Sequence, residues 1–327
     1  MSSDILTVRI PEEYARQRLD AVLVELFPDY SRSRLQQWIK NGHVLVNGKA
    51  PKAKDKVLGD EQVEIHLDSL PMETECQPQA IPLDVVYQDD DLLVINKPVG
   101  LVVHPAAGHA DGTLQNALLH YDPRLAEVPR AGIVHRLDKE TSGLLVVARN
   151  LKSHKSLVDQ LQARTVQREY RAIVLGVMTA GGTVEQAIGR NPRDRKRQAV
   201  REDGKEAITH YRVIQRFRGH TLIKVNLETG RTHQIRVHMA HIHYPLVGDQ
   251  VYGGRLKFPR GASEPLKLAL RQFQRQALHA GRLALVHPVT GKKMSWKADL
   301  PDDMCNLLQA LEQDMEEVDD WDEYDLD

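Results

Sequence analysis

The stretch Gly132–Gly143, G-I-V-H-R-L-D-K-E-T-S-G, crowds ionisable side chains into a short segment. Asp138 stands there among His135, Arg136 and Lys139, one acid beside three basic or potentially basic groups. Positive neighbours stabilise the charged form of a carboxyl group, and an ionised, oriented carboxylate can serve as a nucleophile. The same pattern also fits an ordinary surface cluster of ion pairs, so this stretch alone leaves both interpretations open.

Three further segments accompany this stretch. They are Asn96–Gly100 (N-K-P-V-G), Arg168–Tyr170 (R-E-Y) and Leu227–Arg236 (L-E-T-G-R-T-H-Q-I-R). Together with H-R-L-D-K-E-T-S-G they resemble, in the same order, the motifs of the RluA-type pseudouridine synthases, which isomerise uridine to pseudouridine in RNA. With the amino-terminal unit described below, the resemblance covers nearly the whole chain outside its acidic end.

The resemblance implies a role for each motif. Asp138 is expected to be the catalytic nucleophile, Tyr170 to pack on the target base, and Arg236 to pair with Asp138. The N-K-P-V-G segment is expected to support the active-site loop. Arg136 is expected to fill the stack left by a flipped base or to grip a neighbouring phosphate; pairing with a nearby acid is the equal alternative. The other expected RNA contacts are Lys97 and Arg231, both at phosphates, with Leu227 and His135.

The implied reaction requires no cofactor. It breaks the bond between uracil and sugar, turns the base and joins a base carbon to the same sugar, so nothing is oxidised or consumed. Whether Asp138 attacks the sugar or the base stays open. We also expect no metal site, because no H-E-x-x-H, cysteine pair or carboxylate at ligand spacing accompanies the candidate histidines. Those candidates are His233, His238, His241 and His243.

Residues 16–67 are predicted to form a small unit of two helices and a hairpin with a basic side. Helical spacing of apolar residues, an Asn47-Gly48 turn and a later alternating strand indicate this order. The segment from Arg18 to Lys49 resembles the S4 RNA-binding domain, and Arg32, Arg34 and Lys40 are expected to contact RNA. The alternative is a structural unit with a solvated basic face.

The sequence predicts an α+β protein of four segments. They are an amino-terminal arm (1–15), the S4-like domain (16–75), a pseudouridine synthase catalytic domain (76–311) and an acidic, disordered tail (312–327). The catalytic domain shows strand candidates at 83–88, 92–96, 143–148, 168–177, 207–214, 221–228 and 280–287. Its helix candidates are 112–120, 153–164, 232–241, 266–276 and 303–313. Because strands and helices do not alternate strictly, we expect a mixed, mainly antiparallel sheet.

Charge is distributed unevenly along the 327 residues. The net charge is −1, but residues 312–327 hold ten acidic side chains and no basic one, which leaves 44 basic and 35 acidic residues elsewhere. A basic body with an acidic end is typical of nucleic-acid-binding proteins, although a mildly basic protein of another class would also fit. We expect the acidic end to be solvated.

The sequence gives no sign of a membrane or an oxidising compartment. No stretch approaches the roughly 18 apolar residues that span a bilayer, and Met1–Arg9 lacks the apolar run of a signal peptide. Cys76 and Cys305 have no paired spacing, which favours reduced thiols. We therefore expect a cytoplasmic protein with no membrane partner.

The resemblance implies isomerisation of specific uridines in large-subunit (23S) ribosomal RNA, in a stem-loop at the subunit interface. The expected partner is this RNA or the pre-50S particle, the expected role is large-subunit maturation, and the protein is expected to be a monomer. The alternatives are a non-catalytic RNA-binding assembly factor and a glycosylase that releases uracil. The motif order favours the enzyme, because a binding module has no need to assemble Asp138, Tyr170 and Arg236.

Overall fold

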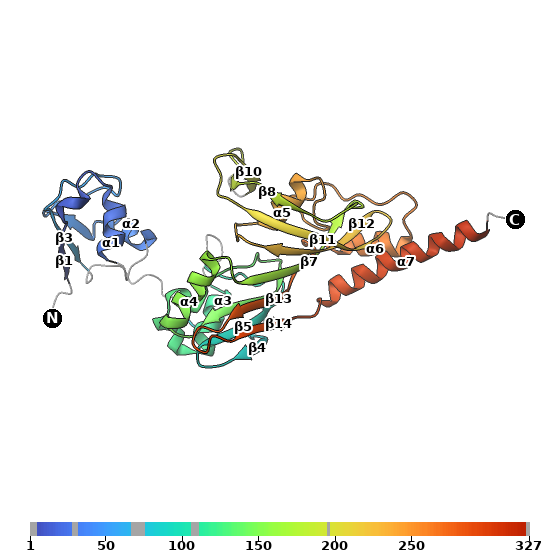
Figure 1. The fold of residues 1–327 in the computed structure, drawn as a ribbon, viewed down its shortest axis with the longest axis horizontal. Helices are drawn as coiled ribbons and strands as arrows, with labels where there is room; N and C mark the ends of the chain where they lie inside the picture. The colour runs from blue at the N-terminus through green and yellow to red at the C-terminus, as the bar shows by residue number, and fades with distance from the viewer. Residues whose placement is uncertain (1–4, 28–31, 67–75, 106–110, 195–196, 325–327) are drawn as a thin grey trace. The chain divides into compact units, whose positions relative to one another are not determined.

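The computed structural model describes residues 5–27, 32–66, 76–105, 111–194 and 197–324, and their side chains except at 32–34 and 317–324. The chain divides into two compact units, residues 1–75 and 76–327 (Figure 1). Among the described residues, no helix is both long and apolar enough to cross a membrane.

The amino-terminal unit packs two helices against a small antiparallel sheet. Its elements are β1 (Ile5–Arg9), the 3-10 helix η1 (Glu12–Tyr14), α1 (Leu19–Leu26), α2 (Arg32–Lys40), β2 (Val44–Val46) and β3 (Gln62–His66), with strand order β1-β3-β2. The apolar positions that predict the helices and the late strand, such as Val22, Leu35 and Ile65, form its core. Asn47 and Gly48 both adopt positive φ, and Val46 and Lys49 exchange backbone hydrogen bonds across them. This confirms the predicted tight turn.

The separate arm predicted over residues 1–15 is wrong. Ile5–Arg9 is a strand that pairs antiparallel with β3, from Ile5 opposite His66 to Arg9 opposite Gln62. Five alternating residues are a weak local signal, and the partner strand lies more than fifty residues further along the chain. Residues 5–9 are therefore part of the sheet.

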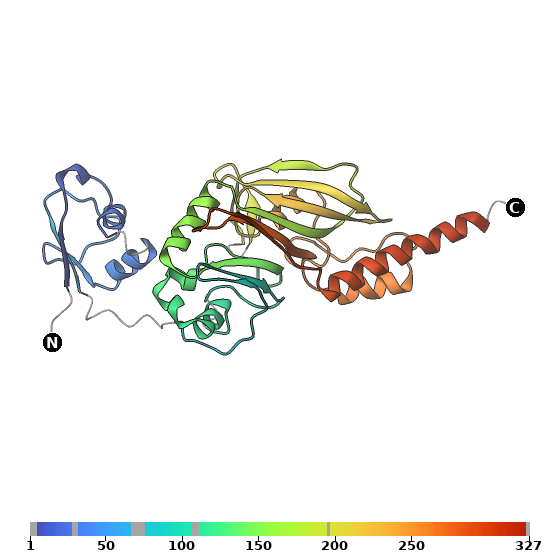
Figure 2. The same ribbon diagram turned by 60° about the horizontal axis from the view of Figure 1, so that its bottom comes forward.

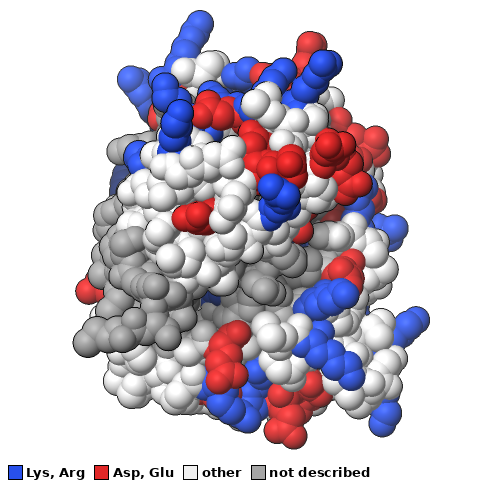
Figure 3. Space-filling model, turned by 90° about the vertical axis from the view of Figure 1, so that its left-hand side faces the viewer, with Lys and Arg blue, Asp and Glu red and all other residues white. Residues whose placement is uncertain are grey.

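The basic residues of this unit are on its surface. Exposed members are Arg16, Arg18, Lys40, Lys49, Lys52, Lys54 and Lys56. The side chains of Arg32 and Arg34, two expected RNA contacts, lie outside the described part of the structure. On the face of the molecule drawn in Figure 3, Lys and Arg side chains gather along the upper edge with Asp and Glu among them. Charges of both signs are therefore mixed on that face.

The carboxyl-terminal unit is built on a nine-stranded sheet of order β4-β5-β6-β13-β7-β12-β11-β8, with β14 beside β13. All its strand pairs are antiparallel except β6 with β13, which confirms the mixed, mainly antiparallel α+β prediction. The strands are β4 (Val85–Gln88), β5 (Leu92–Lys97), β6 (Ser142–Ala148), β7 (Gln167–Leu175), β8 (Gly182–Glu185), β11 (Ile208–Arg216), β12 (His220–Leu227), β13 (Leu278–Val286) and β14 (Lys293–Lys297); β9 (Ile188–Arg190) and β10 (Gln198–Val200) form a separate hairpin.

Helices cover both faces of this sheet around β5 and β6. Leu93 and Leu145 pack with α3 (Leu114–Tyr121), whereas their neighbours Leu92 and Leu144 pack with Leu157 of α4 (Leu151–Gln162). Strands buried on both faces read as continuous apolar runs. The remaining helices are η2 (Pro123–Glu127), η3 (Pro129–Gly132), α5 (Gln234–His241), α6 (Glu264–Gln272) and α7 (Asp302–Tyr324).

The acidic end is helical rather than disordered over most of its length, which corrects the tail predicted for residues 312–327. Helix α7 runs alongside α6 and continues to Tyr324, extending away from the rest of its unit (Figure 2). Leu307 and Leu311 pack in the core with α6. Asp314 is only 2% exposed, and its carboxylate accepts hydrogen bonds from Arg218 and from the Ser263 amide. The high proportion of acidic residues in this segment does not reveal these contacts.

The parallel contact of β6 with β13 is tight where the H-R-L-D stretch enters β6. Gly143 lies opposite Ala280 with φ of +111°, and a Cβ added there would come within 2.3 Å of the Ala280 carbonyl oxygen. Glycine is thus required at the end of the motif by backbone conformation and by space.

Replacing Gly143 by alanine should strongly destabilise this unit, because the new methyl group would collide with Ala280. Gly291→Ala is a matched control, since Gly291 has φ of +67° but open space around an added Cβ. The control should lower the free energy of unfolding by about 1–2 kcal/mol. Gly143→Ala should cost roughly 2 kcal/mol more. Urea unfolding measures both, and equal losses would contradict the steric explanation.

Candidate active site

Asp138 lies in the loop between η3 and β6, and its backbone is fixed from two sides. Its carbonyl accepts a hydrogen bond from the Thr141 amide at 3.0 Å. The following carbonyl groups, of Lys139 and Glu140, accept from Lys97 Nζ and Arg275 Nη1 at 3.0 and 3.2 Å. Two cations thus hold the turn that follows Asp138.

Lys97, expected from the sequence to contact phosphate, supports this loop in the structure. Its side chain is fully buried, and Nζ donates to the carbonyl oxygens of Pro98, Leu101 and Lys139 at 2.8, 3.0 and 3.0 Å. Burial lowers the pKa of Lys97 to about 8, although the charges of Glu140 and Asp138 oppose this. The N-K-P-V-G motif therefore acts on the loop through one ammonium group.

His135 is a neutral structural group, so it does not supply a positive charge to RNA. Burial, assisted by the charge of Arg168, lowers the pKa of His135 to about 3. Its Nε2 accepts a hydrogen bond from the Val146 amide at 3.1 Å. Strand β6 pairs with β13 only at Ser142 and Gly143. Further along β6, the backbone amide of Val146 donates its hydrogen bond to the His135 ring.

The structure brings Asp138 and Arg236 together although 98 positions separate them. Arg236 is in the first turn of α5, and its Nη1 donates to Asp138 Oδ2 at 3.0 Å. The Asp138 side chain is 16% exposed and that of Arg236 only 7%. The carboxylate is thus paired from the protein side and still reachable from solvent.

Gln234 fixes the turn that starts α5. Its side-chain oxygen accepts from Thr229 Oγ1 at 2.8 Å and from the Arg231 amide at 2.9 Å, while its Nε2 donates to the Ile208 carbonyl at 3.0 Å. The preceding residue, His233, adopts a left-handed φ of 56°. The T-G-R-T-H-Q segment thereby turns Arg236 towards the Asp138 loop.

Sequence reasoning missed Asp249 and Tyr252 as parts of this site. Asp249 accepts two parallel hydrogen bonds from Arg236, at 2.7 Å from Nε and 2.9 Å from Nη2. Burial favours the neutral acid, but Arg236 and the amides of Val251 and Tyr252 outweigh it and lower the pKa of Asp249. The Arg236 guanidinium carbon also lies 5.0 Å from the centre of the Tyr252 ring. A buried carboxylate requires a positively charged partner, but the sequence alone does not show which residue that partner is.

Tyr170 lies on β7 in the core cluster that also holds Ile235, with Leu227 packed against it. It is 5% exposed, and among the described residues its hydroxyl has no hydrogen-bond partner. Burial raises the pKa of Tyr170, and the charge of Asp138 acts in the same direction. The side chain is therefore a neutral phenol near the carboxylate.

Two other expected RNA contacts differ in their surroundings. Arg136 is exposed and has no ion-pair partner within the described ranges. Arg231 is partly exposed, and its Nε donates to the Glu206 carbonyl at 2.8 Å. Both can present a guanidinium group outward.

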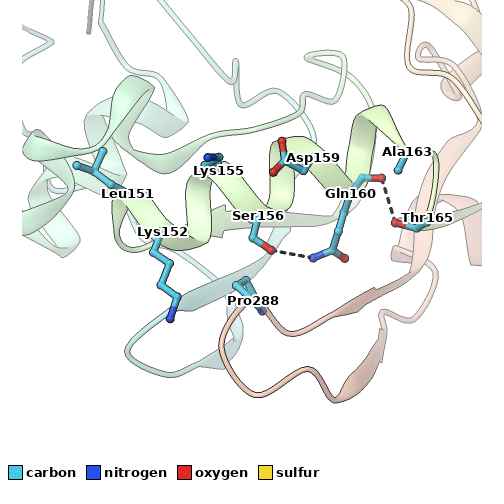
Figure 4. Close-up of a pocket in the computed structure, with 9 residues that line it drawn as sticks. All are labelled: Leu151, Lys152, Lys155, Ser156, Asp159, Gln160, Ala163, Thr165 and Pro288. Atoms are coloured by element: carbon cyan, nitrogen blue, oxygen red, sulfur yellow. Dashed lines mark hydrogen bonds between the residues drawn. The ribbon is translucent and has the colours of Figure 1, made fainter. Parts of the chain in front are cut away.

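Among the histidines considered as metal ligands, His233 lies beside Asp138, with its Nε2 3.9 Å from Oδ1. His238 uses both ring nitrogens in contacts with Thr209 and Gln186. A shallow groove of about 620 Å³ runs between α4 and Pro288, with Lys152 and Lys155 at its rim (Figure 4). The residues that line it include none of Asp138, Tyr170 and Arg236. The candidate site is thus defined by the contacts of these side chains and not by a deep pocket among the described residues.

Comparison with known sequences decides the family. The model for RNA pseudouridylate synthases matches residues 91–241, and that for the S4 domain matches residues 17–63. The chain is 56% identical over 313 residues to ribosomal large subunit pseudouridine synthase D of Escherichia coli (strain K12), covering 95% of this chain and 96% of that protein. The chain belongs to the RNA pseudouridylate synthase family. The protein of the same name from Xanthomonas campestris pv. campestris is 53% identical to this synthase over 314 residues, 96% of this chain and 95% of that protein.

Solved structures agree with this assignment. Human RNA pseudouridylate synthase domain containing 4 matches with a TM-score of 0.55 and 25% identity, over 70% of the synthase and 93% of that chain. Human RNA pseudouridylate synthase domain containing 1 matches with a TM-score of 0.52 and 25% identity, over 72% and 96%. The chain is thus an RNA pseudouridine synthase with an S4 domain.

Lys97→Met tests whether Lys97 supports the loop or contacts phosphate. The loop should shift when three carbonyl groups lose their donor, and a misplacement of about 1 Å can cost roughly 10²-fold in rate. RNA affinity and its salt dependence should stay near wild type. A lost phosphate contact would instead reduce the slope of log affinity against log salt by about 1. Lys293→Met, at an exposed lysine of β14, is the control for losing one positive charge.

Proposed function

We propose that this synthase isomerises specific uridines in large-subunit (23S) ribosomal RNA, with Asp138 as its nucleophile. The observation that carries the catalytic role is the 3.0 Å pair between Asp138 Oδ2 and Arg236 Nη1, in which the carboxylate remains partly exposed. The choice of RNA is supported by the names of relatives that match almost end to end. A stem-loop at the subunit interface is the proposed target.

The proposed reaction rearranges bonds within one nucleotide. The bond from uracil N1 to the sugar C1′ breaks, and a bond from uracil C5 to the same C1′ forms. C5 loses a proton and N1 gains one, so the balance is an isomerisation that needs no nucleotide cofactor. An oriented carboxylate can form the transient covalent bond that such a transfer requires.

The target uridine has to leave its stack to reach Asp138. In the proposal, the extruded uracil stacks on Tyr170, a contact worth roughly 1–3 kcal/mol by analogy with other base stacking. Because burial raises the pKa of Tyr170, its hydroxyl takes part as a neutral phenol. The exposed Arg136, next to the nucleophile loop, fills the vacated stack or holds the adjacent phosphate; Arg231 is a second phosphate contact.

The S4 unit is proposed to provide affinity and target choice. Its exposed lysines and arginines suit a phosphate backbone, whose counterions are released on binding. The partner is 23S RNA or the pre-50S particle, which places the enzyme in the cytoplasm, where ribosomes assemble. All three catalytic residues come from one chain, so we propose that a monomer is active.

Asp138→Asn should abolish pseudouridine formation and leave RNA binding intact, because the amide keeps the shape but loses the charge and nucleophilicity. Mapping pseudouridines in 23S RNA from cells that carry only this variant gives the readout. Asp203→Asn, at an exposed aspartate with 69% of its side chain accessible, is the control. A non-catalytic assembly factor would function normally with the Asp138→Asn substitution, and a glycosylase would release free uracil.

Removing residues 1–75 should weaken RNA binding or broaden the choice of uridines without abolishing the chemistry. The remaining unit, residues 76–327, contains Asp138, Tyr170 and Arg236. Binding to 23S RNA fragments and the map of modified sites would be compared with those of the full chain. Unchanged affinity together with an unchanged map would contradict the role given to the S4 unit.

A further inference from the structure

The two carboxylate oxygens of Asp138 face different side chains. Oδ2 accepts the 3.0 Å hydrogen bond from Arg236, and Oδ1 lies 3.9 Å from Nε2 of His233. Because Arg236 occupies Oδ2, Oδ1 is the oxygen that remains available to substrate. His233 is therefore the side chain next to the reactive oxygen.

Both neighbours of Asp138 are braced by one short segment, Asp249–Tyr252. Asp249 accepts two hydrogen bonds from Arg236, and its Oδ1 also accepts one from the Tyr252 amide at 3.0 Å. The Tyr252 hydroxyl lies 2.9 Å from His233 Nδ1. A single turn thus sets the position of the arginine and of the imidazole.

The hydrogen bonds at Tyr252 favour one neutral tautomer of His233. The Tyr252 oxygen already accepts from the Gln198 amide at 2.9 Å. A phenol has one hydrogen to donate, and within the described residues His233 Nδ1 is the acceptor within its reach. When the hydroxyl donates to Nδ1, a neutral ring carries its hydrogen on Nε2, the atom that faces Asp138.

The surroundings of His233 favour this neutral ring. Burial lowers the pKa of His233, with Asp138 and Asp249 opposing and Arg236 and Arg136 assisting. Its Nε2–H group can therefore act on Asp138 as a dipole, without neutralising the carboxylate as an imidazolium would. The 3.9 Å separation between His233 Nε2 and Asp138 Oδ1 is longer than a hydrogen bond, and such contacts often tighten when substrate binds.

We propose that His233 is a positioning residue for the nucleophile, and that the Tyr252 hydroxyl holds its Nε2–H towards Asp138 Oδ1. Arg236 and His233 together then fix the plane of the carboxylate from both oxygens. This inference rests on the proposed role of Asp138. The brace itself can be tested independently of that role.

The first test is the protonation state of His233 in full-length enzyme. Nitrogen-15 NMR of histidine-labelled protein should show Nδ1 unprotonated and Nε2 protonated in the wild type. In Tyr252→Phe, which removes only the hydroxyl, the two neutral tautomers should become mixed. A wild-type spectrum with the proton on Nδ1 would overturn the proposal, whatever Asp138→Asn does to activity.

The second test is a double-mutant cycle on single-turnover pseudouridine formation, with RNA affinity measured separately. Tyr252→Phe should lower the rate about tenfold or more, as loss of the correct tautomer does elsewhere, with affinity within about twofold. His233→Gln keeps an amide N–H near Nε2 and has no tautomer to fix, so it should retain more activity than His233→Ala. Adding Tyr252→Phe to His233→Gln should then bring little further loss.

Controls separate this role from simple loss of structure. Tyr87→Phe removes a hydroxyl that donates to Asp89 at 2.6 Å outside the site, and it should leave the rate unchanged. Melting temperatures of all variants show that they fold. A wild-type rate in Tyr252→Phe, or the same loss from Tyr252→Phe in both backgrounds, would refute the proposed coupling.

Discussion

The proposed catalytic centre depends on one buried guanidinium group shared by two carboxylates. Arg236 gives two of its donors to Asp249 and a third to Asp138. Burial disfavours its charge, but the two acids outweigh this and raise the pKa of Arg236 above its ordinary value. Since Asp249 already takes the stronger, two-point contact, Asp138 is oriented without being fully neutralised. A carboxylate held in this way is fixed in direction while its other oxygen stays clear of the guanidinium.

The contacts of Arg236 and Asp138 depend on segments of the unit that lie far away in the sequence. The Asp249 turn has to remain in place, and the Tyr252 ring is held between Arg236 and Arg197, whose guanidinium carbons lie 5.0 and 5.3 Å from its centre. On the other side of the loop, Arg275 contacts the Glu140 carbonyl and forms a two-point pair with Asp303 at the start of α7. Hairpin β9–β10 and helix α7 are thus both connected to the catalytic loop.

The features that could be predicted from the sequence are those that a local residue pattern or a known motif indicates. The sequence signals are strong for the mixed sheet, the longer helices and strands, and the Asn47-Gly48 turn. In these segments the hydrophobic periodicity and the turn-forming residues agree. The pairing of Asp138 with Arg236 followed from motif resemblance. It could not be read from spacing, because 98 positions separate the two residues.

The errors have a common physical origin. Strand β1 and the acidic part of α7 are stabilised by partners far along the chain, β3 and α6, which local composition does not reveal. Lys97 and His135 were interpreted as basic groups by residue type, whereas burial decides what they do. Asp249 and Tyr252 were missed because an acid and a tyrosine acquire a role only from the neighbours that folding provides.

The parallel contact between Ser142–Gly143 and His279–Ala280 has a consequence for how the enzyme is made. The segment that follows Asp138 is paired with a strand synthesised more than a hundred residues later. Arg275 is added just before that strand, and Asp303 after it. A nascent chain on the ribosome therefore carries Asp138 long before it can hold that side chain in place. The Asp138 loop therefore gains its last contacts only when nearly the whole polypeptide has been synthesised.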